Sequence, residues 1–299
     1  MMVFQQRSIT MFEQADEFLA AQRMRRKLSN LSIRCYRSAL TRIARWMAQH
    51  GESVLSEANI EAYLREIMDN QYSRSTFATA TVVLNRWIKF YKLPLRMPGL
   101  TMPRQRRQAN YISPEEIGVI FANIPRTTAQ GITDYAIIDL AYSTGMRRSE
   151  ICKLQYCDVN WEQRYIFIRY GKRGKQRFVP FMGVLRKSLR AYLKKVRPTK
   201  LSAHCSNFFF VSPKGNRPLN DNDMQELNAR INNEYSPFKK HITLHRLRHA
   251  CATHLSENGA DLRLIGLILG HGSPDITSEY IDYSEEYLAK VFKKGHPRA

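Results

Sequence analysis

The 299-residue sequence has few acidic residues, few cysteines and no long apolar run. Only 26 aspartates and glutamates stand against 47 lysines and arginines, and the chain shows no carboxylate cluster suited to magnesium. The five cysteines include no CxxC pair, so we expect reduced thiols rather than disulfides or zinc. No segment approaches the roughly 18 apolar residues of a membrane span, and the N-terminus lacks a signal-peptide core. We therefore expect a cytosolic protein without metal or cofactor.

The surplus of basic residues gives a net charge of +21, which is the most unusual feature of the composition. Such an excess attracts polyanions, and nucleic acid is the commonest of them. A membrane surface is the alternative partner, but the missing apolar span speaks against it. The hydrophobic fraction of 43% is ordinary for a folded chain, so we expect one or two domains with cores of their own.

Residues 1–93 predict a domain made of helices. Apolar residues recur at helical spacing in the first two of four stretches, and a serine opens each of the last three. The helices are expected at 11–28, 32–49, 56–68 and 73–91. Arg34 and Arg37 on the second helix are candidates for contacts with nucleic acid, although a solvated surface would show the same pattern.

Residues 94–110 predict a linker. The segment contains three prolines, one glycine and several basic residues, without a hydrophobic period. Proline also disfavours helix at the residue before it, which suits an extended strap. Arg104, Arg106 and Arg107 can lie along a phosphate backbone, or the segment can be a solvated tether.

Residues 111–299 predict a second domain that combines helices with a small antiparallel sheet. Ser113 and Pro114 suit the cap and first position of a helix whose first turn is acidic. Further helices are expected at 134–143 and from near Arg147. Aromatic and branched residues predict a β-hairpin with a basic tip and one more short strand, at 165–170, 176–181 and 208–211.

The stretch 242–283 predicts two amphipathic helices followed by a third. Thr243 can cap the first helix and Gly259 can end it. His245 and Arg248 are three positions apart on this helix, so they emerge side by side.

The second helix of this stretch is expected from Asp261, its cap, to Gly270. That glycine delivers His271 onto a turn. A serine and a proline then begin the third helix, which carries Tyr280. A histidine, an arginine, a second histidine and a tyrosine are thus placed at helix ends and turns.

Together these residue types can perform phosphoryl transfer. Two arginines can hold the non-bridging oxygens of a phosphodiester and stabilise the charge of a pentavalent phosphorus. A tyrosine hydroxyl, with an ordinary pKa of about 10, needs help from a base or a positive field, which His245 or His271 could give. A lysine at the hairpin tip is a reasonable proton donor for the leaving 5′-oxygen. No metal ion is required.

The order and spacing of these residues resemble the signature of tyrosine recombinases, the phage-integrase family, in their Xer-like branch. The sequence has H-x-x-R at 245–248, L-G-H at 269–271 and a tyrosine nine residues after that histidine. Residues 144–150, TGMRRSE, match the family pattern TGxRxxE, and GKRGKQRFVP matches its hairpin motif. The resemblance covers nearly the whole chain. It implies Arg147, Lys172, His245, Arg248 and His271 as catalytic residues with Tyr280 as the nucleophile, and Glu150 as an orienting acid.

The resemblance also implies an activity and an assembly. The expected fold is mainly α with a small antiparallel sheet, in a two-domain clamp around duplex DNA. The expected reaction cleaves DNA through a 3′-phosphotyrosine link, exchanges strands between two specific sites and rejoins them without ATP. We expect a homotetramer on two sites, with accessory DNA-bending proteins as possible partners, in the cytoplasm at the nucleoid. Arg173 and Lys175 are further candidates for DNA contacts, and an apolar stripe in the tail, Tyr287, Leu288, Val291 and Phe292, is expected to contact a neighbouring protomer.

Three alternatives remain at this point. Type IB topoisomerases use the same chemistry to nick and reseal DNA without a partner site. A non-catalytic DNA-binding protein could retain the fold, although all six catalytic positions match. A metallohydrolase could use His245 and His249, which have the spacing of an HExxH zinc pair, but Arg246 stands where the glutamate belongs.

Overall fold

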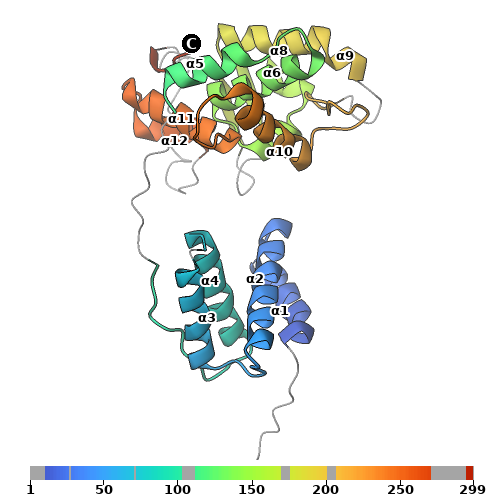
Figure 1. The fold of residues 1–299 in the computed structure, drawn as a ribbon. Helices are drawn as coiled ribbons and strands as arrows, with labels where there is room; N and C mark the ends of the chain where they lie inside the picture. Colours follow the sequence, from blue (N-terminus) through green and yellow to red (C-terminus); the bar gives the residue numbers. More distant parts are fainter. Residues whose placement is uncertain are drawn as a thin grey trace, which may run out of the picture. The chain divides into compact units, whose positions relative to one another are not determined.

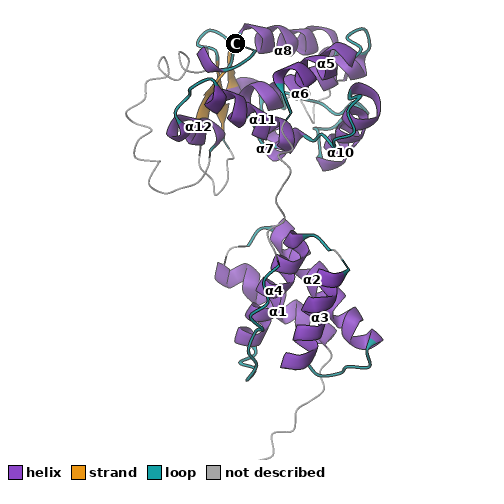
Figure 2. Cartoon of the chain, turned by 60° about the vertical axis from the view of Figure 1, so that its left-hand side comes forward, coloured by secondary structure: helices purple, strands orange, loops and turns teal. Residues whose placement is uncertain are grey.

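The computed structural model describes residues 11–26, 28–70, 72–102, 112–169, 176–200, 207–270 and 294–298. They form two compact units that divide near residue 106 (Figures 1 and 2). The described residues are mainly helical, with one three-stranded antiparallel sheet in the C-terminal unit. The expected fold class is therefore confirmed.

The N-terminal unit contains the four predicted helices, α1 (Met11–Arg26), α2 (Asn30–Gln49), α3 (Glu57–Asp69) and α4 (Arg74–Phe90). Helices α3 and α4 begin where they were predicted, and Ser56 and Ser73 cap them, each accepting a backbone N–H three residues on. The second helix begins earlier than predicted because its cap is Ser29, whose hydroxyl accepts the N–H of Ser32.

Two aromatic clusters hold these helices together. Phe18 of α1 lies against Trp87 of α4, with ring centroids 5.2 Å apart. Trp46 of α2 lies against Tyr63 of α3, and its indole N–H donates to the Glu66 carboxylate at 2.5 Å. Each helix therefore buries one apolar face and leaves the other to solvent.

The first part of the predicted linker packs on the N-terminal unit. Leu95, Met97, Leu100 and Met102 are partly buried against the α2–α3–α4 core. The N–H of Arg96 donates to Glu57 at 2.7 Å. The prediction that this segment has no hydrophobic period was therefore wrong, because alternate residues of an extended chain share a face on each side of the Pro98–Gly99 break. Residues 103–111, which include Arg104, Arg106 and Arg107, lie outside the described residues, so the rest of the linker stays a prediction.

The C-terminal unit begins with α5 and its capping box, formed by Ser113 and Glu116 as predicted. Its elements are α5 (Pro114–Asn123), α6 (Ala129–Thr144), α7 (Arg148–Lys153), η1 (Tyr156–Asp158), β1 (Val159–Asn160), β2 (Tyr165–Ile168), β3 (Arg177–Pro180), α8 (Gly183–Lys195), α9 (Arg197–Lys200), α10 (Asp221–Arg230), the π-helical turn η4 (Ile231–Tyr235), α11 (Leu244–Glu257) and α12 (Leu262–Leu269).

Helix α6 is the centre of this unit. It is buried along nearly its whole length and contacts both α8 and α11. It ends at Gly145, whose φ of 62° is in the left-handed region that glycine adopts readily. A Cβ at this position would lie 2.2 Å from Leu269 Cδ2, so the turn also lets α12 approach closely. The chain therefore leaves α6 sharply and begins α7 directly beside α12.

The predicted hairpin is confirmed as β2 and β3, which pair antiparallel with Ile166 opposite Val179. Its tip at 170–175 lies outside the described residues. The predicted strand 208–211 is wrong, because Phe208 and Val211 form only isolated bridges. The N–H of Val211 instead donates to the Tyr192 hydroxyl at 2.9 Å, so a side chain replaces a strand partner.

The described end of the chain, residues 294–298, contacts its own C-terminal unit. Asn258 donates to the Gly295 carbonyl at 2.7 Å, and Arg298 donates to the buried carboxylate of Asp139 at 3.0 Å. The Arg298 guanidinium also lies 3.8 Å from the centre of the Phe121 ring. The apolar stripe at 287–292 lies outside the described residues. None of the described helices is long and apolar enough to cross a bilayer.

Candidate active site

The turn after α6 brings Arg147 to the start of α7, where it is the cap residue. Glu150, three residues on, accepts the backbone N–H of Arg147 and one N–H of its guanidinium, both at 2.8 Å. A single carboxylate thus closes the first turn of α7 and fixes the direction of the Arg147 side chain.

A third arginine, Arg177, joins this pair from the start of β3. Its guanidinium donates to both oxygens of Glu150, at 2.9 and 2.8 Å, as a bidentate ion pair. The side chains of Glu150 and Arg177 are 1% and 3% exposed. Burial alone would raise the pKa of Glu150, but the hydrogen bonds and charges of Arg177 and Arg147 together lower it. Glu150 is therefore a buried anion held between two cations.

Arg177 is a site residue that was not predicted from the sequence. The available signal was the alternation along β3, in which Arg177 and Val179 are buried while Phe178 faces outward. An arginine on the inward face of a strand needs a buried partner.

Arg248 extends from α11 into the same place. It is 4% exposed, and it donates to the carbonyls of Gly145 and, at 2.6 Å, Leu269. Among the described residues no carboxylate lies within ion-pair distance of it. Burial, followed by the charges of Arg147 and Arg177, lowers the pKa of Arg248 to about 10. Among the described residues, three guanidinium groups and one carboxylate leave the cluster with two uncompensated positive charges.

The end of α12 organises this cluster. Three successive carbonyl groups of its last turn each accept a hydrogen bond from a different arginine: Ile268 from Arg177, Leu269 from Arg248 and Gly270 from Arg147. These carbonyls have no partner within their own helix and carry its partial negative charge, so they attract cations. Figure 2 shows α12 beside the strands, and the chain continues from it directly to His271.

His245 lies one turn before His249 on α11, and their Nε2 atoms are 3.0 Å apart. Burial, followed by the charges of His249, Arg248 and Arg147, lowers the pKa of His245 from its usual 6.5. The imidazole is therefore neutral at pH 7 and can accept a proton. In the described part of the chain, no third ligand-type side chain completes a metal site at this histidine pair.

The structure therefore brings together Arg147, Glu150 and Arg248, with His245 on the same helix as Arg248. The other predicted site residues, Lys172, Arg173, Lys175, His271 and Tyr280, lie outside the described residues. In the N-terminal unit, Arg34 is exposed on α2, and Arg37 forms an exposed ion pair with Asp16 at 2.7 Å.

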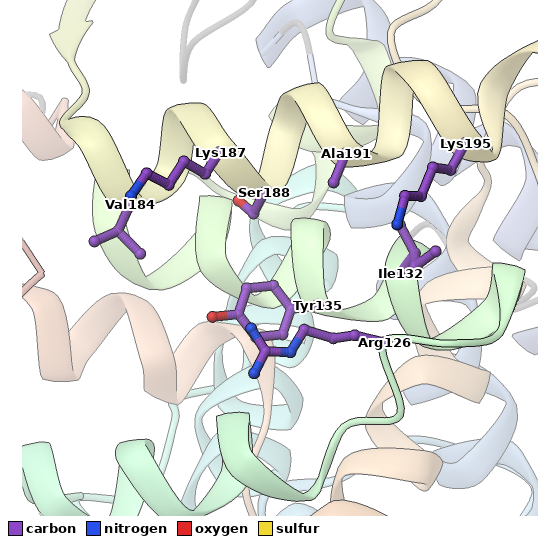
Figure 3. A pocket seen from close by; sticks show the side chains of 8 residues that line it. All are labelled: Arg126, Ile132, Tyr135, Val184, Lys187, Ser188, Ala191 and Lys195. Atoms are coloured by element: carbon purple, nitrogen blue, oxygen red, sulfur yellow. The ribbon is translucent and has the colours of Figure 1, made fainter.

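A separate pocket of about 290 Å³ lies between α6 and α8, where basic side chains surround an apolar floor (Figure 3). It is lined by Arg126, Ile132, Tyr135, Val184, Lys187, Ser188, Ala191 and Lys195. This pocket shares no residue with the arginine cluster. The cluster, which contains the predicted site residues Arg147 and Arg248, is the candidate active site.

Two family profiles match the chain. The phage integrase family matches residues 110–286, and the phage integrase N-terminal SAM-like domain matches residues 15–93. Tyrosine recombinase XerC of Bacillus pumilus (strain SAFR-032) is 30% identical over an alignment of 295 residues. The alignment covers 94% of this chain and 95% of the relative.

Two solved structures show the same fold at low identity. The Tn1549 transposon integrase in complex with transposon right end DNA has a TM-score of 0.69 and 16% identity, and the match covers 92% of this chain and 95% of that one. A lambda integrase tetramer bound to a Holliday junction has a TM-score of 0.67 and 14% identity, and the match covers 89% of this chain and 78% of that one.

The profile matches extend over both units and include the arginine cluster, and the full-length similarity to a XerC protein favours recombination over a topoisomerase or a non-catalytic role. The chain belongs to the phage integrase family and is a site-specific tyrosine recombinase.

Proposed function

We propose that this recombinase cuts each DNA strand with Tyr280. The tyrosine oxygen attacks the scissile phosphorus, a 3′-phosphotyrosine bond forms, and the bond to the 5′-oxygen breaks. Lys172 gives that oxygen its proton. The free 5′-hydroxyl of the second site then attacks the phosphotyrosine and releases the tyrosine. The number of phosphoester bonds is unchanged, so no ATP is consumed.

One observation carries this proposal, namely that the described residues form a net positive cluster in which no carboxylate pairs with the buried Arg248. A buried cation is costly unless an anion compensates it, and a phosphodiester is an anion of the right shape for two forked guanidinium groups. Arg147 uses only two of its five N–H groups in the described contacts, so it has donors left for a phosphate. The same two arginines would stabilise the charge that develops at phosphorus.

The two histidines complete the proposed chemistry. His245 is neutral at pH 7 and can take the tyrosine proton during attack. The Gly270 carbonyl accepts from Arg147 at 2.7 Å, and His271, the next residue in the sequence, is proposed to assist at the same phosphate.

The proposed assembly is a homotetramer on two specific double-stranded DNA sites, in the cytoplasm at the nucleoid. The similar lambda integrase was solved as a tetramer bound to a Holliday junction, and the Tn1549 integrase was solved in complex with DNA. We extend both properties to this chain. Contact of its C-terminal tail with a neighbouring protomer, and help from accessory DNA-bending proteins, belong to the same proposal.

The test compares Arg147→Gln and Arg248→Gln with a control, Arg190→Gln, which changes an exposed arginine of α8. On a nicked suicide duplex carrying the recombination site of this protein, each active-site variant should lose covalent adduct by about 10²–10³-fold, the cost of removing one donor from a transition state. Binding of intact duplex should stay near normal, and the control should cleave at the wild-type rate. Wild-type cleavage by both active-site variants would contradict the proposal.

A further inference from the structure

The Glu150 carboxylate is shared between two arginines with different surroundings. Its Oε1 accepts from Arg147 Nη1 at 2.8 Å and from Arg177 Nη1 at 2.9 Å. Its Oε2 accepts from the backbone N–H of Arg147 and from Arg177 Nη2, both at 2.8 Å. The Arg147 side chain is 23% exposed, whereas that of Arg177 is 3% exposed. Arg147 can therefore meet a phosphate from solvent, and Arg177 is enclosed behind it.

The ion pair between Arg177 and Glu150 changes the net charge beside Arg147. A carboxylate paired with Arg147 alone would orient that arginine but would also cancel its charge, and the pair would attract a phosphate weakly. Arg177 supplies the charge that balances Glu150, so Arg147 is oriented by the carboxylate and still contributes a positive charge.

Arg177 of β3 also contacts both α7, through Glu150, and α12. It is the first residue of β3. Its Nε donates to the Ile268 carbonyl of α12 at 2.7 Å, one residue before the carbonyl that receives Arg248. A Cβ at Gly270 would lie 3.0 Å from Arg177 Nη1, so the guanidinium fills the space under the turn that leads to His271.

We propose that Arg177 is a positioning residue for DNA cleavage, which acts through Glu150 on the charge and direction of Arg147 without contacting DNA. The inference rests on the proposed function, because it assumes that Arg147 holds the scissile phosphate. It goes beyond that function in assigning a role to an arginine outside the family's catalytic set.

The test uses Arg177→Met, which removes the charge, and Arg177→Lys, which keeps the charge but cannot reach both oxygens of Glu150. Each is assayed for covalent adduct on two suicide duplexes, one with an ordinary scissile phosphodiester and one with a neutral methylphosphonate. The methylphosphonate lacks the negative charge that Arg147 neutralises. On the phosphodiester, Arg177→Met should slow adduct formation about 10²-fold. On the methylphosphonate, Arg177→Met should slow adduct formation by less than about tenfold, because this substrate lacks the negative charge with which Arg147 interacts.

A second comparison isolates the route through Arg147. If Arg177 acts through that residue, the double variant Arg147→Gln/Arg177→Met should cleave the phosphodiester no more slowly than Arg147→Gln alone. The Arg177→Lys variant should recover part of the rate lost in Arg177→Met. Equal losses on both substrates, or multiplicative losses in the double variant, would overturn the inference.

Folding and function are separated by two controls. If the Arg177→Met protein does not fold, the comparison is made with Arg177→Lys, and failure of both to fold would assign Arg177 a purely structural role and overturn the inference. A wild-type protein that gives no adduct on the phosphodiester would overturn the proposed function, and this inference with it. Normal wild-type cleavage with unaffected Arg177 variants would overturn the inference alone.

Discussion

The three arginines at the end of α12 differ in their freedom to meet a ligand. Arg177 donates to Glu150 and to a backbone carbonyl. Arg248 is buried and donates to two carbonyls, whereas Arg147 is partly exposed. A helix C-terminus stabilises a cation by about 0.3–1 kcal/mol, and by up to about 2 kcal/mol when partly buried. Contacts of this size offset only part of the cost of burying Arg248, so the cluster gains further from a bound phosphate.

At the residue scale, the lowered pKa of His245 predicts the pH dependence of cleavage. The neutral imidazole is the form that accepts the tyrosine proton, so cleavage should be constant near neutral pH and fall as pH drops through the lowered pKa, below 6.5. His249→Ala removes one of the groups that lower this pKa. The acidic limb of the rate profile should then move to higher pH, measured as adduct formation with saturating DNA. A limb that stays in place or moves down would contradict this account.

The candidate site was predictable where residues follow an ordered pattern. Arg147, Glu150 and Arg248 lie in motifs whose spacing rarely arises by chance, and Arg147 and Glu150 lie at the start of α7. Arg177 could not be found in that way, because a single arginine beside the basic hairpin tip looks like one more solvated charge. Its role depends on Glu150 and Ile268, which are 27 and 91 residues away in sequence.

At the scale of elements, helices with a capping residue and one apolar face were predicted well, as α3, α5 and α11 show. Neither α8 nor α10 was predicted from the sequence, although Leu185, Leu189 and Tyr192 recur at helical spacing in α8. Strand pairing was also predicted for 208–211, where the N–H of Phe209 donates to the Leu154 carbonyl and that of Val211 donates to the Tyr192 hydroxyl. Local pattern indicates which residues are buried, but it does not identify a distant hydrogen-bond partner.

The turn between α6 and α7 gives a prediction of stability. Gly145→Ala places a side chain at a φ of 62° and 2.2 Å from Leu269 Cδ2, so it should destabilise the protein by about 1–3 kcal/mol. Because the neighbouring carbonyls hold Arg248, cleavage should fall as well. Gly118→Ala is the matched control, since that glycine lies within α5 with open space around it and should stabilise by about 0.5–1 kcal/mol. Chemical denaturation measures the free energy of unfolding of both variants. Equal values for Gly145→Ala and Gly118→Ala would contradict this prediction.

The C-terminal segment gives a second prediction at this scale. Burial, followed by the charges of Arg298 and His254, lowers the pKa of His296 from 6.5 to about 4. A buried histidine of lowered pKa must be neutral in the docked state, so docking is complete above about pH 6.5 and weakens as pH falls toward 4. Hydrogen exchange of the amides at 294–298, corrected for the intrinsic rate, should rise over that range. His296→Gln should remove the pH dependence, and an unchanged profile in this variant would assign it to another group.

For the whole molecule, the net charge of +21 predicts electrostatic binding to DNA. Each phosphate neutralised by a lysine or arginine releases counterions, so the affinity for any duplex should fall steeply as salt rises. Replacing Arg104, Arg106 and Arg107 by glutamine should weaken binding almost equally on all sequences and make the salt slope shallower. Titrations at several salt concentrations measure this. A flat salt response of the wild-type protein would contradict the electrostatic account.

In the proposed reaction, Tyr280 becomes covalently joined to DNA. Tyr283 is the alternative nearby, but Tyr280 is nine residues after His271 whereas Tyr283 is twelve. The direct measurement traps the adduct on a nicked suicide duplex and identifies the linked residue by peptide mapping. Tyr280→Phe should bind DNA with near-normal affinity and give no adduct, whereas Tyr283→Phe should still give one. A phosphotyrosine link formed by the Tyr280→Phe protein would contradict the assignment of Tyr280 as the nucleophile.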